Sequence, residues 1–153
     1  LLNRVTFSLN TSTNDNEGEP NMLTQEHLDK VAAFHGHICP GMLIGFKAVE
    51  GAIAQLGLSD EALPAVDEEI VAVVENDACG VDAMQVLFGC TYSKPNLIAR
   101  IRGKMAFSFF SRDTGKSVRL VLKPSFARSS ESDAPKKKFA ISPSFLAESM
   151  SAN

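Results

Sequence analysis

An apolar stripe that begins directly after a proline constrains the fold of this chain most strongly. Pro40 suits the first position of a helix, because its missing N–H would have no partner there. Apolar side chains then recur at spacings of three and four residues, at Met42, Phe46, Val49, Ile53 and Leu56. Gly57 follows and is typical of a helix end. The sequence therefore predicts a helix over residues 40–56 with one face packed in a core.

The segment F-H-G-H-I-C-P-G, residues 34–41, places two imidazoles and a thiol at alternate positions just before this helix. In an extended backbone His35, His37 and Cys39 lie on one side, within reach of one ion. Cys39 falls at the N-cap of the helix, where free N–H groups and the helix dipole stabilise a thiolate. We expect a metal site here, in preference to the alternative of core histidines and an inert thiol.

A second chemical segment, E-N-D-A-C-G-V-D, spans residues 75–82. It follows a β-branched run at 70–74 that predicts a buried strand, and it precedes a short helix that Gly89 ends. Cys79 is thus a second thiol at a transition into a helix, and Cys90 comes just after the helix. Asp82 is a candidate ligand, a partner of a histidine or a base beside bound water, or a simple first-turn charge.

Mixed nitrogen and sulfur donors suit a transition metal ion, with zinc as our first choice and iron, nickel or copper as alternatives. The chain has no paired C-x-x-C, so the pattern differs from common structural zinc sites and favours an open coordination position. Two other chemistries use the same residues. Cys39 and Cys79 could cycle through a disulfide, with Cys39 also a candidate nucleophile, or the site could only staple a docking module.

The remaining pattern predicts an α+β fold: a small, mostly antiparallel sheet packed against two main helices in a single core domain. The first helix begins after Thr24 and ends near Gly36. Strands are expected at 70–74, 97–101, 104–111 and 117–122. The segment D-T-G-K-S at 113–117 resembles the end of a phosphate loop, but Phe110 occupies the place of its first glycine, so we interpret it as a hairpin turn.

We expect three regions along the chain: a disordered N-terminal arm over 1–21, the metal-binding core domain over 22–124, and a polar tail over 125–153 with one candidate docking turn at 145–150. Val5, Phe7 and Leu9 alternate like a strand, but no hairpin partner is evident.

Charge and composition exclude some classes of partner. The net charge is −3, and the one cluster of like charge, Lys136–Lys138, suits a solvated tail, so we expect no nucleic-acid binding. No apolar run approaches the roughly 20 residues of a membrane span, and we expect a cytoplasmic protein without membrane contact. Three cysteines clustered near histidines favour metal or redox use over a disulfide framework.

These motifs resemble the FmdE family, which is associated with formylmethanofuran dehydrogenase. The resemblance covers residues 28–124 and rests on the two segments above, on Q-V-L-F-G-C-T at 85–91, N-L-I-A-R at 96–100 and G-K-M-A-F-S-F at 103–109. It implies an α+β core domain, usually dimeric, with a transition-metal site at His37, Cys39 and Cys79 and with His35 and Cys90 close by. Longer members append a zinc ribbon, but no cysteine follows Cys90, so we expect the short, core-only form.

The resemblance implies a metal-binding protein that is accessory to molybdenum- or tungsten-dependent oxidoreduction of formylmethanofuran or formate-type one-carbon substrates. A homodimer and a molybdenum or tungsten oxidoreductase complex are the expected assemblies. The alternatives are a thiol- or metal-dependent redox enzyme in its own right, and a metal chaperone or sensor that docks on a larger complex.

Overall fold

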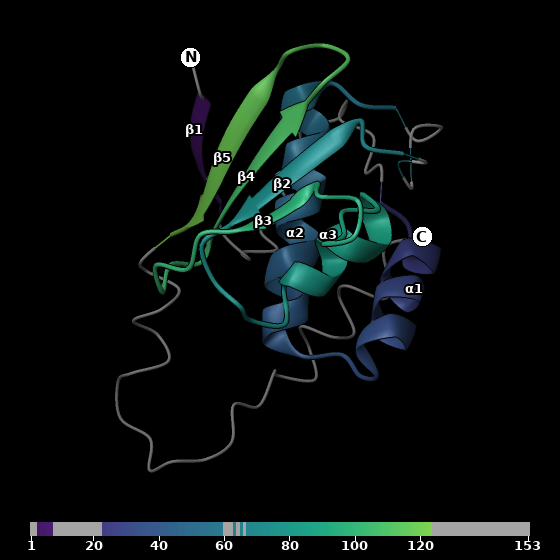
Figure 1. Cartoon of the computed structure of the whole chain (residues 1–153). Coiled ribbons are helices and arrows are strands. Elements are labelled where there is room, and N and C mark those ends of the chain that lie inside the picture. Colours follow the sequence, from purple (N-terminus) through teal and green to yellow (C-terminus); the bar gives the residue numbers. More distant parts are fainter. Residues whose placement is uncertain (1–2, 8–22, 60–62, 64, 66, 124–153) are drawn as a thin grey trace, which may run out of the picture.

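The protein is described by a computed structural model that covers residues 3–7, 23–59, 63, 65 and 67–123. These residues form one α+β unit (Figure 1). In chain order its elements are β1 (Asn3–Phe7), α1 (Gln25–His35), α2 (Pro40–Leu56), β2 (Ile70–Val74), α3 (Val81–Leu87), β3 (Leu97–Ala99), β4 (Ala106–Ser111) and β5 (Ser117–Leu122). The predicted fold class is confirmed.

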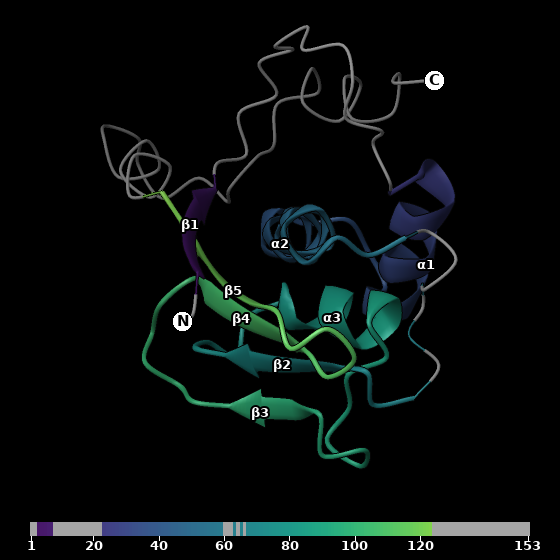
Figure 2. The ribbon, with the colours of Figure 1, turned by 90° about the horizontal axis from the view of Figure 1, so that it is seen from above.

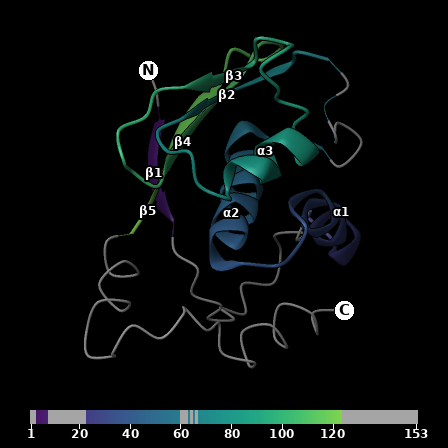
Figure 3. The same cartoon turned by 60° about the horizontal axis from the view of Figure 1, so that its bottom comes forward.

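The sheet of the described residues has the order β1-β5-β4-β2-β3. Its central strand β4 runs antiparallel to both β2 and β5, whereas the outer pairs β1–β5 and β2–β3 are parallel. The helices α1, α2 and α3 all lie on the concave face of this sheet (Figure 2). Helix α2 packs directly on β5 and β4, and α3 lies between α1 and the sheet (Figure 3).

Both main helices begin and end where local sequence signals place them. Helix α1 has Thr24 as its N-cap, and Gly36 ends it with a φ of 91°, a left-handed conformation that glycine adopts without steric cost. Helix α2 has Cys39 as its N-cap and Gly57 as its C-cap. The predicted apolar stripe of α2 is buried, with Met42, Val49 and Ile53 almost fully enclosed. The predicted helices are therefore confirmed.

All four predicted strands are present, two of them with one shortened end. Strands β2 and β5 have the predicted bounds, but β3 stops at Ala99 and β4 starts at Ala106. Between them the backbone N–H groups of Arg100 and Arg102 donate to the carbonyls of Val74 and Glu75, so the chain wraps around the end of β2. The hairpin turn before β5 is also confirmed.

Residues 3–7 correct the prediction of a disordered N-terminal arm. They form β1, which pairs in parallel with β5 from Asn3 opposite Val118 to Phe7 opposite Leu122. The sequence offered no hairpin partner because the partner strand lies more than a hundred residues further on, and such pairing leaves no local signal. The rest of the arm and the tail from residue 124, including the candidate docking turn, lie outside the described residues.

The core fills the space between α2, α3 and the sheet. Phe88 packs edge-to-face on Phe109 of β4 with ring centroids 5.3 Å apart. Leu120 and Val118 of β5 close the other end of this core. None of the helices in the described ranges is long and apolar enough to cross a membrane.

Candidate metal site

The first two donors come from the junction of α1 and α2. His35 is the last residue of α1, and the left-handed turn at Gly36 reverses the chain so that Cys39 starts α2 beside it. The His35 Nε2 atom lies 3.5 Å from the Cys39 Sγ atom. That sulfur also accepts a hydrogen bond of 3.4 Å from the backbone N–H of Met42 in the first turn of α2. The predicted N-cap position of Cys39 is thus confirmed.

Cys79 reaches the same place because α2 and the turn after β2 approach very closely. A Cβ atom on Gly45 would overlap the backbone carbonyl of Gly80, and one on Gly41 would lie 3.1 Å from the Cys79 Cβ. The turn itself is held by Asn76, which accepts from the N–H of Ala78 and donates to the carbonyl of Lys104. These glycines bring the second thiol to the N-terminus of α2.

The three donor atoms form one compact group. One ligand atom each from His35, Cys39 and Cys79 lies within 4.8 Å of the other two. Around a tetrahedral zinc ion, neighbouring nitrogen and sulfur ligands are separated by about 3.5–3.8 Å, as follows from the usual bond lengths. The spacing and the chemistry of the donors therefore fit a transition metal ion after small side-chain adjustments.

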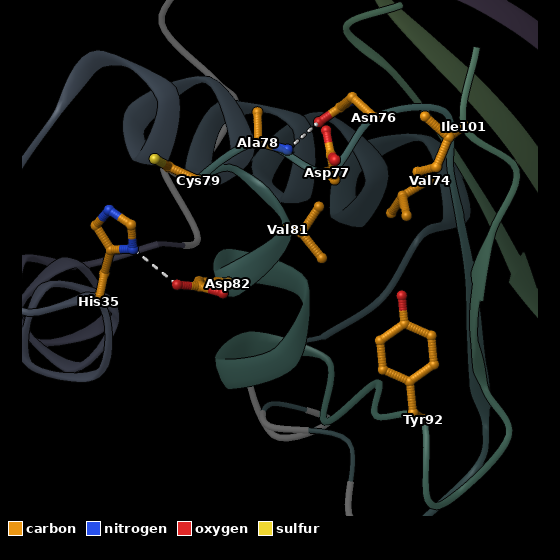
Figure 4. A pocket seen from close by; sticks show the side chains of 10 residues that line it. All are labelled: His35, Val74, Asn76, Asp77, Ala78, Cys79, Val81, Asp82, Tyr92 and Ile101. Atoms are coloured by element: carbon orange, nitrogen blue, oxygen red, sulfur yellow. Dashed lines mark hydrogen bonds and ion pairs between the residues drawn. The ribbon is translucent and has the colours of Figure 1, made fainter. Parts of the chain in front are cut away.

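Asp82 stands behind His35 on the side away from the thiols (Figure 4). Its Oδ2 atom lies 2.7 Å from His35 Nδ1, and its Oδ1 atom accepts a 2.9 Å bond from Gln85 Nε2. A carboxylate on one ring nitrogen fixes the proton there and leaves the other nitrogen free as a ligand. The arrangement therefore directs the lone pair of His35 Nε2 toward Cys39.

The two thiols of the group have different proton affinities. Partial burial favours the neutral form of Cys39, but the Met42 N–H, the Cys79 thiol and the His35 ring together outweigh it and lower the pKa. The pKa of Cys79 is raised, first by burial and then by its hydrogen bond to Cys39. The pKa of His35 is raised chiefly by the hydrogen bond to Asp82. Cys39 is thus the thiolate of the pair in the metal-free protein.

The other two candidate ligands lie outside this group. His37 is exposed and stacks against His35 with ring centroids 4.7 Å apart, but it does not join the three donors. Cys90 is fully buried, and its Sγ donates to the carbonyl of Ile70 at the start of β2. Cys79 follows the other end of that strand, roughly 13 Å further on at the rise of a β-strand. The structure thus places His35, and not His37, beside the thiols.

Sequence reasoning missed the close approach of Gly45 to Gly80 and the cavity beside the donors. The spacing of Gly41 and Gly45, four residues apart on α2, is the signal that could have indicated a tight helix contact. The cavity has a volume of about 360 Å³ and borders His35, Cys79 and Asp82 (Figure 4). It is formed by segments distant in sequence, so no single motif predicts it.

The fold and the donors define a small α+β domain with a His/Cys group of the kind that can hold a metal ion. The family model described as FmdE, Molybdenum formylmethanofuran dehydrogenase operon, matches residues 34–148, and the chain belongs to this family. The resemblance inferred from the motifs is confirmed.

Two known proteins are similar to this chain. A probable S-adenosyl-L-methionine-binding protein of Archaeoglobus fulgidus is 36% identical over 104 residues, which cover 68% of this chain and 28% of that protein. The chain therefore spans less than a third of that relative's length. A crystal structure of an FmdE-like protein of tungsten formylmethanofuran dehydrogenase, from Syntrophus aciditrophicus, matches 77% of this chain and 80% of its own, with 23% identity and a TM-score of 0.41.

Proposed function

We propose that this chain binds one transition metal ion through His35 Nε2, Cys39 Sγ and Cys79 Sγ. The observation that carries the proposal is the group of three soft donors within 4.8 Å, with Asp82 bound to the opposite nitrogen of the histidine. Zinc suits one nitrogen and two sulfurs best, and iron or nickel are the alternatives. His37 and Cys90 have supporting places, the first at the rim of the site and the second in the core beneath the sheet.

Three protein ligands leave one coordination position for water or a substrate, which is typical of catalytic rather than structural zinc sites. A bound ion would supply Lewis acidity at this position. The protein's own contribution is to hold the proton on His35 Nδ1 through Asp82 and to provide Cys39 as a thiolate. The cavity beside Cys79 gives a small molecule access to the same position.

The proposed setting is accessory to molybdenum- or tungsten-dependent oxidoreduction of formylmethanofuran or formate-type substrates, in the cytoplasm. The family's link to the formylmethanofuran dehydrogenase operon supports it. We propose a homodimer that associates with such an oxidoreductase complex. Phe34, an apolar side chain 58% exposed at the end of α1, supports a contact with another protein. Sedimentation of the protein and of a Phe34→Ser variant tests the dimer.

Metal analysis of protein purified without added metal tests the site. We expect near-stoichiometric metal in the wild type and in Cys90→Ala, and none in a Cys39→Ser, Cys79→Ser double variant. A second matched pair compares the histidines: His35→Ala should lose metal, whereas His37→Ala should keep it. Equal metal in all variants would contradict the proposed ligands, and loss of metal in His37→Ala alone would exchange the roles of the two rings.

The contact between the two thiols favours a second candidate, a redox pair. Cys79 donates a hydrogen bond to Cys39, and a lowered pKa makes Cys39 the attacking thiolate. Closing the disulfide would release two protons and pass two electrons to an oxidant of the disulfide class. The same purified protein decides between the candidates: bound metal with two free thiols supports the metal site, and metal-free protein with a Cys39–Cys79 disulfide supports the redox pair.

A further inference from the structure

The cavity beside the metal site has two chemically different ends (Figure 4). His35, Cys79 and Asp82 lie at one end, and Val74, Tyr92 and Ile101 lie at the other. Its volume of about 360 Å³ is within the range of small-molecule sites. The cavity therefore has room for a compact organic molecule that contacts both ends.

The outer end offers apolar surface that the fold leaves uncovered. Tyr92 is 69% exposed and Ile101 is 54% exposed, and both face a cavity whose inner wall includes Val74 and Val81. Large apolar side chains that gather at one opening, as these do, are a usual sign of a binding site. The ring of Tyr92 can also attract a cation through its π-face.

The inner end carries negative charge. Asp77 and Asp82 both line the cavity, and no Lys or Arg does so within the part of the chain that the structure describes. Asp82 is occupied by His35 and Gln85. Asp77 is exposed, and among residues 3–7, 23–59, 63, 65 and 67–123 it has no hydrogen-bond or ion-pair partner. A divalent ion held by two thiolates adds no net positive charge to this end.

We propose that this cavity binds a small organic cation, with its charged group at the Asp77 carboxylate and its apolar part between Tyr92, Val81 and Ile101. The inference deepens the proposed function, on which it rests for the role of the bound molecule, by naming the chemical class that reaches the metal. Arg100 and Arg102 flank Ile101 in sequence but do not line the cavity. An anionic ligand held by these arginines is the competing outcome.

Three ligands with one ring and different charges test the class: benzylamine, benzyl alcohol and benzoate, titrated at low ionic strength against metal-loaded and metal-free protein by ligand-observed NMR. We expect benzylamine to bind at least about tenfold more tightly than benzoate, since one carboxylate attracts the first and repels the second. Asp77→Asn should abolish this preference, and Asp113→Asn, in the exposed hairpin turn, should leave it unchanged. Tyr92→Ala should weaken all three ligands. Circular dichroism verifies that each variant is folded.

The outcomes separate this inference from the proposed metal site. Benzoate binding that exceeds benzylamine binding and is lost in Arg102→Gln would overturn the organic-cation site. Absence of binding by every ligand, in protein that carries near-stoichiometric metal, would overturn it while leaving the metal site standing. A preference for benzylamine that depends on Asp77, in protein that takes up no metal, would support the cavity and overturn the metal site.

Discussion

Two cysteines of this chain, Cys39 and Cys90, show how neighbours decide the chemistry of one side-chain type. Cys39 is partly exposed, caps a helix, and accepts a hydrogen bond from the N–H of Met42. Cys90 is fully buried under apolar side chains and donates to the carbonyl of Ile70. The environment of Cys39 stabilises a negative sulfur, and that of Cys90 stabilises a neutral one.

The proton affinities follow from these environments. The N–H of Met42, with Cys79 and His35, outweighs partial burial and lowers the pKa of Cys39, whereas burial raises the pKa of Cys90 to about 12. Only a thiolate is a good nucleophile or metal ligand. The comparison teaches that a cysteine in a chemical motif, as Cys90 is in Q-V-L-F-G-C-T, can serve packing alone.

The largest expected difference is in alkylation rate. In metal-free, folded protein at neutral pH, iodoacetamide should modify Cys39 about a thousandfold or more faster than Cys90, because the two thiolate fractions and exposures differ so widely. Peptide mapping by mass spectrometry measures both rates in one sample. Unfolded protein is the control, in which the rates should become similar. Comparable rates in the folded protein would break the comparison.

The next effect concerns the contact that brings Cys79 to Cys39. Gly45→Ala would press a methyl group into the backbone carbonyl of Gly80 and should lower the free energy of unfolding by about 3 kcal/mol. Gly51→Ala, on the same helix, meets only Leu120 at ordinary contact distance and should be neutral or stabilising by up to about 1 kcal/mol. Urea denaturation measures both variants.

Metal content adds a second result to that pair. Gly45→Ala should lose metal because Cys79 is displaced, and Gly51→Ala should retain it. Full metal content and unchanged stability in Gly45→Ala would show that the contact does not position the site.

A smaller change is expected from the partner of His35. Asp82→Asn removes the carboxylate that holds the Nδ1 proton and should weaken metal affinity by about 10- to 100-fold. Competition with a chelator of known affinity measures the change. Asp113→Asn, in the hairpin turn, is the matched control and should have no effect. An unchanged affinity in Asp82→Asn would mean that Asp82 only fixes the first turn of α3.

The smallest effect is the pH dependence of stability from Cys90. Its pKa is about 12 when folded and about 8.5 when unfolded, so its contribution is complete below pH 8.5 and is lost as the pH rises toward 12. Relative to Cys90→Ala, the free energy of unfolding of the wild type should fall by about 1.3 kcal/mol between pH 8 and pH 9.5. Parallel pH profiles for the two proteins would show that Cys90 is not buried as a neutral thiol.

Sequence alone predicted the elements that carry their own local signals. Pro40 and Gly57 bounded α2, Thr24 and Gly36 bounded α1, and the β-branched run gave β2 its limits. It also identified the two chemical segments and the family. These predictions succeeded because caps, glycine conformations and apolar periodicity act over a few residues.

The tertiary structure decided what depends on distant pairs of residues. Strand β1 needs β5, and the group of donors needs the approach of Gly45 to Gly80. Alternation along 35–39 made the two histidines equivalent in the sequence, but the helical turn ends at His35, so that ring meets Cys39 and Asp82 while His37 faces solvent. Sequence thus determined which residue types are available for chemistry, and packing between helices and the sheet decided which of them meet.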